Sequence, residues 1–226
     1  MNEKSWSISC AGAHHKKENI PCEDYSSSGK KNGMKFIVIA DGAGSLENSK
    51  EGAEIAGKAI VDYVSRNFER LYSEDVARAK FFIMNHILFS IKQKRRDREI
   101  KSFGSTLVFL GVKKGQLIMF HLGDGAILAE NRDKYNIISK PMNGESKSHT
   151  WLTTTKDAHK FARFDRGIST SNFYVAVSDG CYHIFENMDE GMLLWNNILN
   201  EDTGEKIKKY IEADCIDDFS FSVMSA

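Results

Sequence analysis

An apolar run ends abruptly in a carboxylate and two glycines in the stretch Lys35-Phe36-Ile37-Val38-Ile39-Ala40-Asp41-Gly42-Ala43-Gly44. Residues 36–40 show no polar alternation, which predicts a strand buried on both faces. A carboxylate at the mouth of such a strand is costly unless a cation or hydrogen bonds compensate it. Asp41 therefore indicates a site that holds something positive. Gly42 and Gly44 allow the backbone to turn and to approach a ligand closely.

Length and composition favour one folded domain. The 226 residues are enough for one substantial core, so we expect a single domain spanning residues 1–226. Hydrophobic residues make up 41% and charged residues 27%, as in soluble globular proteins. Lys+Arg and Asp+Glu both number 31, and this balance gives no general attraction to nucleic acid or to an anionic membrane.

Cysteine usage and hydropathy indicate a compartment. Cys10, Cys22, Cys181 and Cys215 show no CxxC spacing, which favours thiols in a reducing environment over a disulfide framework. The opening MNEKSWSISC has no apolar signal core. No apolar run approaches the roughly 20 residues that a membrane helix needs. We expect a cytoplasmic protein without a membrane partner.

Apolar periodicity predicts the remaining elements. Strands are expected at residues 6–11, 25–28 and 36–40, at 106–112, 116–122, 126–130 and 135–139 as an antiparallel meander, and at 173–178 and 219–224. Helices are expected around residues 56–68, 76–91, 192–199 and 205–213. Strand-rich segments flanked by helix pairs predict packed sheets with helices outside.

Acidic residues recur where strands end. Asp41, Asp124 and Asp179 are each followed by glycine, and the pairs Glu23-Asp24 and Asp217-Asp218 add two more acidic points. Carboxylate-only clusters suit Mg²⁺ or Mn²⁺, and the sequence offers no Cys/His spacing for zinc. These residues predict a metal site. Taken alone, Asp124-Gly125 is more typical of a hairpin turn than of a functional site, and Asp217-Asp218 is compatible with a simple turn before a strand.

Six segments resemble a known family. CEDY, IADGAG, FGSTLVFL, HLGDGAILAE, VAVSDGCY and IDDFSFSV occur in the order found in metal-dependent protein phosphatases of the protein phosphatase 2C type, over residues 9–223. Gly12-Ala13-His14 and Pro21-Cys22 are similar to the opening of small bacterial members. The resemblance implies an α+β fold, a four-layer α-β-β-α sandwich of two antiparallel sheets flanked by helix pairs. It also implies a phosphoprotein substrate, phosphorylated by a Ser/Thr kinase and hydrolysed at serine or threonine.

The resemblance also implies roles for individual residues. The family's hydrolytic water is activated by two metals, Mg²⁺ or Mn²⁺, with a looser third ion in some members. Asp41 matches the bridging ligand and Gly42 contributes its carbonyl, Glu23 matches the second metal, Asp179 and Asp217 the first metal, and Asp124 the looser third. Asp41 and Asp179 are thereby the expected catalytic carboxylates. Asp218 stands where many relatives carry asparagine, so either Asp217 or Asp218 is expected to reach the metal.

Two departures concern the phosphoryl group. The position after Asp41-Gly42, a histidine and proposed general acid in eukaryotic members, is Ala43. The arginine expected four residues before Glu23 is Asn19. His14, His15, Lys16 and Lys17 lie just upstream and are candidates to bind substrate or donate a proton. The alternative for these four is a solvated turn, in which case a metal-bound water is the expected acid.

Residues 141–170 form the longest stretch without apolar periodicity, and long loops in compact domains are often functional. We expect this stretch to be a flap on the substrate side. Its basic residues, which would attract phosphopeptides, are Lys147, His149, Lys156, His159, Lys160, Arg163 and Arg166. An ordinary solvated loop is the alternative.

Two rival functions remain at this stage. A catalytically weak or inactive relative would act as a phosphopeptide-binding or regulatory module, but the four principal carboxylates argue against it. A small-molecule phosphomonoesterase would use the same metals with a different pocket.

Overall fold

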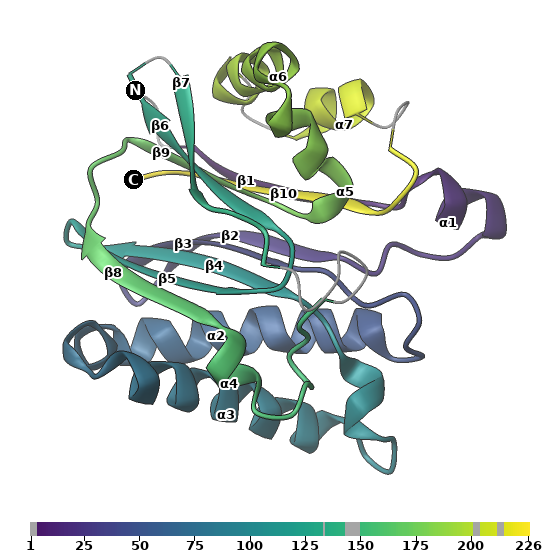
Figure 1. Cartoon of the computed structure of the whole chain (residues 1–226), viewed down its shortest axis with the longest axis vertical. Coiled ribbons are helices and arrows are strands. Elements are labelled where there is room, and N and C mark those ends of the chain that lie inside the picture. Colours follow the sequence, from purple (N-terminus) through teal and green to yellow (C-terminus); the bar gives the residue numbers. More distant parts are fainter. Residues whose placement is uncertain (1–3, 133, 143–149, 201–203, 212–214) are drawn as a thin grey trace.

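Two five-stranded antiparallel sheets pack face to face between helix pairs (Figure 1). The structure is a computed structural model that describes residues 4–132, 134–142, 150–200, 204–211 and 215–226. One sheet has the order β1-β10-β9-β6-β7, formed by Ser5–Cys10, Phe219–Ser225, Phe173–Val177, Ala126–Asn131 and Lys134–Ser139. The other has the order β2-β3-β4-β5-β8, formed by Tyr25–Lys31, Met34–Ala40, Leu107–Lys113, Gln116–Leu122 and Arg163–Ile168.

Long helices cover the outer face of each sheet. α2 (Ser49–Ser73) and α3 (Val76–Lys94) lie under the β2–β8 sheet, and α6 (Met188–Asn200) and α7 (Glu205–Ile211) lie over the other (Figure 1). The short helical elements are α1 (Ala13–Glu18), η1 (Ile100–Phe103), α4 (Ala158–Phe161), α5 (Asp179–Tyr182) and η2 (His183–Glu186). The predicted α-β-β-α sandwich is confirmed. Among the described residues, no helix has the length and apolarity required to span a bilayer.

Strand β3 lies in the middle of this architecture, as its apolar run predicts. Phe36, Val38 and Ala40 belong to the core between the sheet and helices α2 and α3. Ile37 and Ile39 belong to the core between the two sheets. Both faces of β3 are therefore buried, and Asp41, which directly follows the strand, lies at the end of the sandwich.

The β2–β3 hairpin is tighter than predicted. Strand β2 extends to Lys31, and only Asn32 and Gly33 form the turn. Both turn residues have positive φ, 50° and 77°. An Asn-Gly pair with this backbone matches the right-handed strand twist, so two residues suffice for the turn and β2 continues past its predicted end at residue 28.

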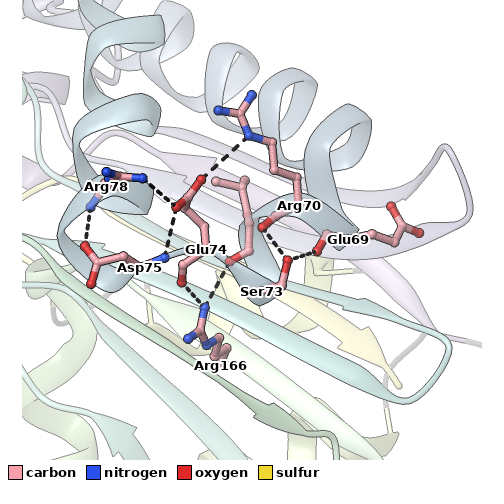
Figure 2. Close-up of polar contacts among 8 residues, drawn as sticks. Glu69, Arg70, Ser73, Glu74, Asp75, Arg78 and Arg166 are labelled. Atoms are coloured by element: carbon pink, nitrogen blue, oxygen red, sulfur yellow. Dashed lines mark hydrogen bonds and ion pairs between the residues drawn. The ribbon is translucent and has the colours of Figure 1, made fainter.

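A cluster of polar contacts joins the α2–α3 turn to edge strand β8 (Figure 2). Arg166 of β8 donates to the carbonyls of Leu71, at 3.4 Å, and Glu74. The Glu74 carboxylate lies 3.8 Å from Arg70 and 3.9 Å from Arg78. Because helix C-terminal carbonyls lack intrahelical partners, Arg166 serves as a cap for α2.

Two expectations about the middle of the chain are wrong. The four strands from 106 to 139 do not form a meander, because β4 and β5 lie in one sheet while β6 and β7 lie in the other. The segment Gly123-Asp124-Gly125 is a crossover between sheets, which excludes the hairpin-turn interpretation of Asp124. Residues 163–168 are not irregular either, since they form edge strand β8 beside β5. A single weakly apolar edge strand carries little periodic signal, so it escaped prediction.

Candidate metal centre

A cavity of about 260 Å³ opens where β3 and β9 end. The residues that line it are His15, Glu23, Asp41, Gly42, Ala43, Gly44, Thr106, Asp124, Thr150, Leu152, Asp179, Asp217 and Asp218. Six of these carry carboxylates, and His15 is the only basic residue among the described lining residues. A phosphate dianion would be repelled from such a cavity unless cations were present.

Three of the carboxylates lie close together. One oxygen from each of Asp41, Asp124 and Asp179 falls within 4.8 Å of the others, a spacing at which they could hold a metal ion. Asp41 follows β3 of one sheet, Asp179 follows β9 of the other, and Asp124 lies in the crossover between the sheets. The sandwich therefore brings together three residues that are distant in the sequence, as predicted from their positions at strand ends.

The charge state of these groups fits a cation. Burial, followed by the nearby Asp24 and Asp179, raises the pKa of Asp41 well above its ordinary value. Burial and the charge of Asp124 raise the pKa of Asp179. These shifts mean that the ionised carboxylates repel one another in a poorly solvated place, and a divalent ion would remove the penalty.

An unpaired oxygen at the cavity fits a cation as well. Within the described residues, the buried Oδ1 of the lining residue Asp124 has no hydrogen-bond partner. Beside the cavity, burial raises the pKa of Asp24, hydrogen bonding to Ser220 and Asp41 lowers it, and the charges of Asp218 and Asp179 raise it further. Buried polar atoms are normally paired, so the unpaired Asp124 oxygen fits a cation ligand. Oxygen donors alone match Mg²⁺ or Mn²⁺.

The Asp217-Asp218 pair divides into two roles. Asp218 accepts hydrogen bonds from the backbone N–H groups of Gly12, at 2.9 Å, and Glu23, at 2.7 Å, and its Oδ1 lies 2.8 Å from Nδ1 of His15. Its oxygens are thus committed to the protein, while Asp217 is exposed at the cavity. Gly12 must lack a side chain, because a Cβ there would lie 2.2 Å from the Asp217 carbonyl oxygen. Of the two, Asp217 is the candidate ligand.

Backbone contacts fix the positions of Asp41 and Glu23. The N–H of Asp41 donates to Thr106 Oγ1 at 3.1 Å, and the N–H of Thr106 donates to the Asp41 carbonyl at 2.8 Å. The Ser49 hydroxyl donates to Glu23 at 2.9 Å. A Cβ on Gly42 would lie 2.8 Å from the Glu23 carbonyl oxygen, so the glycine allows these two segments to meet.

The four basic candidates of α1 lie in different places. His15 lines the cavity, and only 16% of its side chain is exposed. The side chain of His14 is 64% exposed and lies 3.7 Å from Glu18. Lys16 and Lys17 are exposed on α1, outside the described cavity lining. Asn19 ends α1 in the left-handed conformation, φ 56°, which asparagine tolerates well.

Three lining residues, Thr106, Thr150 and Leu152, were not predicted. Thr150 donates its hydroxyl to Asp124, and Leu152 lies beside it at the cavity. Thr153, the next residue, is buried and donates its N–H to the Ser105 carbonyl at 2.8 Å, which docks this segment next to Thr106. The run Thr150-Trp151-Leu152-Thr153 shows neither helical nor strand period, so no local pattern marked it.

The basic residues of the expected flap are mostly engaged elsewhere. Arg163 and Arg166 belong to β8 and bond to Ser139 and to the end of α2. His159 packs edge-on against Phe81 of α3, with ring centroids 5.4 Å apart. Lys160 pairs with Asp157 at 3.0 Å. Lys147 and His149 lie outside the described residues.

Comparison with known proteins identifies the class. A family model described as Protein phosphatase 2C matches residues 11–212. The chain therefore belongs to the protein phosphatase 2C family of metal-dependent serine/threonine phosphatases, and the resemblance in its motifs is confirmed. It is 26% identical over 199 residues to serine/threonine-protein phosphatase 3 of Escherichia coli (strain K12), covering 81% of this chain and 77% of the relative.

Solved structures share the fold. PppA, described as a key regulatory component of T6SS in Pseudomonas aeruginosa, has a TM-score of 0.73 at 14% identity, with 100% of this chain and 98% of that chain covered. The Mycobacterium tuberculosis serine/threonine phosphatase PstP/Ppp has a TM-score of 0.71 at 13% identity, with 99% and 98% covered. At such identities the likeness concerns the fold.

Proposed function

We propose that this chain, as a single domain, removes phosphate from phosphoserine and phosphothreonine in proteins at the acidic cavity. The observation that carries the proposal is the convergence of six carboxylates on one cavity whose described lining includes no lysine or arginine. Such a cavity binds phosphate only after it has bound cations. Membership of a metal-dependent phosphatase family supports the same chemistry.

The proposed ligands for Mg²⁺ or Mn²⁺ are the carboxylates of Glu23, Asp41, Asp179 and Asp217, with the Gly42 carbonyl and a looser position at Asp124. When bound, two such ions would supply an activated water and charge neutralisation on the phosphoryl oxygens. The chain's own residues supply placement. Hydrogen bonds to Thr106 fix the backbone of Asp41, and hydrogen bonds to Asp218 fix the positions of Glu23 and His15 at the cavity.

His15 is the proposed proton donor to the departing serine or threonine oxygen. Because an ionised carboxylate only accepts hydrogen bonds, the contact with Asp218 places a hydrogen on Nδ1 and leaves Nε2 as the nitrogen for proton exchange. Ala43 has no proton to give. Elsewhere on α1, the exposure of Lys16 and Lys17 supports the solvated-surface interpretation over phosphate anchoring.

The direct test measures hydrolysis of an aryl phosphate with and without Mn²⁺, followed by a panel of phosphopeptides, nucleotides and sugar phosphates. We expect Mn²⁺-dependent turnover with phosphopeptides preferred. Turnover confined to small metabolites would favour the phosphomonoesterase alternative. Binding of phosphopeptides without turnover would favour the regulatory-module alternative.

A variant of the crossover separates the looser position from the principal site. Asp124→Ala should reduce turnover at low Mn²⁺ while leaving the tight Mn²⁺ sites intact, because Asp124 is one ligand among several and lies in a separate loop. Calorimetric Mn²⁺ titration alongside turnover checks this. Unchanged turnover at every Mn²⁺ concentration would remove Asp124 from the site.

Of the flap expected over residues 141–170, residues 163–168 form strand β8, and we propose that the described residues 150–162 form the substrate-side part. Lys156 is exposed there, three residues from buried Thr153, so Lys156→Glu should raise the KM for phosphopeptides several-fold and spare aryl phosphate turnover. Lys30→Glu is the matched control, since Lys30 pairs with Lys35 well along the hairpin from Asp41. Equal effects of Lys156→Glu on both substrates would contradict the flap assignment.

The proposed partners follow from the proposed activity. A phosphoprotein produced by a Ser/Thr kinase would be the substrate, and the zero net charge supports neither nucleic acid nor membrane as a partner. The cytoplasm is the proposed location, supported by the absence of disulfide-type cysteine spacing in the sequence.

A further inference from the structure

His121 of β5 is a fully buried histidine next to the crossover that carries Asp124. Its Nε2 lies 3.0 Å from the Gly123 carbonyl oxygen, and its Nδ1 lies 2.6 Å from the Ser139 hydroxyl of β7. The same Ser139 hydroxyl accepts a hydrogen bond from Arg163 of β8 at 3.0 Å. Four residues from three strands and the crossover thus form one continuous chain of contacts.

The direction of this chain is fixed by chemistry. A carbonyl oxygen only accepts, so Nε2 of His121 must carry the hydrogen. Burial and the charge of Arg163 lower the pKa of His121 to about 4, so the ring is neutral near pH 7 and Nδ1 is an acceptor. Ser139 then donates to Nδ1 while it accepts from Arg163. Arg163 thus donates to Ser139, Ser139 donates to His121, and His121 donates to the Gly123 carbonyl.

The chain ends on the peptide that precedes Asp124. Gly123 has φ +108°, and a Cβ at this position would lie 2.6 Å from Thr106, the residue that also holds Asp41. Its carbonyl accepts a second hydrogen bond from the N–H of Met142 at 2.8 Å. Two hydrogen bonds therefore fix the orientation of the Gly123 peptide, and with it the orientation of the next residue, Asp124.

We propose that His121 is a positioning residue for Asp124. Its hydrogen bond to the Gly123 carbonyl orients the peptide before Asp124 and so directs the Asp124 side chain toward the cavity. The part of this proposal that concerns cation affinity rests on the proposed function of Asp124. A buried histidine that only tied the sheets together would need its bond to Ser139, since Ser139 lies in the other sheet. The bond to Gly123, two residues away on the same chain, does not join the sheets and acts only on the crossover.

Two substitutions distinguish these roles. The amide of His121→Gln can reach the position of Nε2 and donate to Gly123, whereas the shorter amide of His121→Asn reaches only the position of Nδ1 and Ser139. We expect His121→Asn to weaken the looser class of Mn²⁺ sites by about tenfold or more and to leave the tight class unchanged. His121→Gln should restore most of the affinity.

The readouts are calorimetric Mn²⁺ titration and NMR of the whole chain without metal. The ¹⁵N shifts of the His121 ring should show the neutral Nε2–H form near pH 7, and the backbone amides of Asp124 and Gly125 should move in His121→Asn and return in His121→Gln. An imidazolium or an Nδ1–H form would overturn the hydrogen-bond chain. Equal Mn²⁺ and amide changes in both variants would overturn the positioning role.

The wild-type titration separates failure of this proposal from failure of the proposed function. If wild type lacks a looser Mn²⁺ class, the role of Asp124 in the proposed function is wrong, and the ring tautomer and the Asp124 amide shift still decide whether His121 positions the crossover. Thermal unfolding of both variants shows how much stability each substitution removes. If the loss of Mn²⁺ affinity in the two variants only paralleled their loss of thermal stability, the proposal would also be overturned.

Discussion

Asp41→Asn is expected to lower phosphate release by about 100-fold or more without loss of the fold. One oxygen of its side chain lies within 4.8 Å of an oxygen of Asp124 and of Asp179, so Asp41 is a proposed ligand of the metal cluster. The backbone of Asp41 is held separately, by reciprocal hydrogen bonds with Thr106, so the amide variant keeps the same local geometry. Asp179→Asn should behave in the same way, because Asp179 completes the same cluster.

The same substitution should stabilise the protein when metal is absent. The pKa of Asp41 is raised above its ordinary value of 3.8, so the folded state keeps the proton to higher pH than the unfolded state. This contribution to the free energy of unfolding is complete below the ordinary pKa and is lost as pH rises through the raised pKa. In EDTA, Asp41→Asn should therefore have a higher Tm than wild type at neutral pH, and the difference should shrink under acid conditions.

The control for Asp41 is Asp165→Asn, because Asp165 is exposed on β8. This variant should match wild type in turnover, in Mn²⁺ binding and in Tm. Calorimetry should show that Asp41→Asn loses tight Mn²⁺ binding in parallel with turnover. Full activity of Asp41→Asn would end the two-metal proposal, and a lower Tm in EDTA would contradict the repulsion described here.

His15→Ala is expected to slow hydrolysis of a phosphoserine peptide by about 100-fold while changing aryl phosphate hydrolysis much less. A serine alkoxide is a poor leaving group and needs a proton, whereas a phenolate leaves without one. His15 is the only basic residue of the described cavity lining, and Asp218 fixes its ring by one nitrogen.

The other basic residues of α1 are the matched controls for His15. His14→Ala, Lys16→Ala and Lys17→Ala should hydrolyse both substrates at wild-type rates, because these residues lie outside the described cavity lining. Slower hydrolysis of both substrates by a lysine variant would instead identify a phosphate anchor. Wild-type peptide turnover by His15→Ala would exclude this histidine as the acid.

Much of the fold was predictable because the signals were local. A five-residue apolar run gave β3, and four-residue apolar spacing gave α2 and α3. The resemblance of the six motifs then implied the four α-β-β-α layers. The meander from 106 to 139 was mispredicted because a glycine-flanked aspartate is the same short pattern whether a chain turns back or crosses to another sheet.

The site was predictable to the extent that its residues end strands. Asp41, Asp124 and Asp179 met this condition, and the structure brings them together. Thr150 did not, because its partner Asp124 lies 26 residues away in sequence and in another segment. Contacts of this kind depend on how the two sheets stack, which no short window of sequence records.

The most direct measurement is phosphate release from a phosphothreonine peptide by metal-free protein to which Mn²⁺ is returned stepwise, with wild type and Asp41→Asn side by side. We expect no release from either protein in EDTA, saturable recovery in wild type, and about 100-fold less recovery in Asp41→Asn. Release that continues in EDTA, or equal recovery by the two proteins, would contradict metal-dependent hydrolysis at the cavity formed by Glu23, Asp41, Asp179 and Asp217.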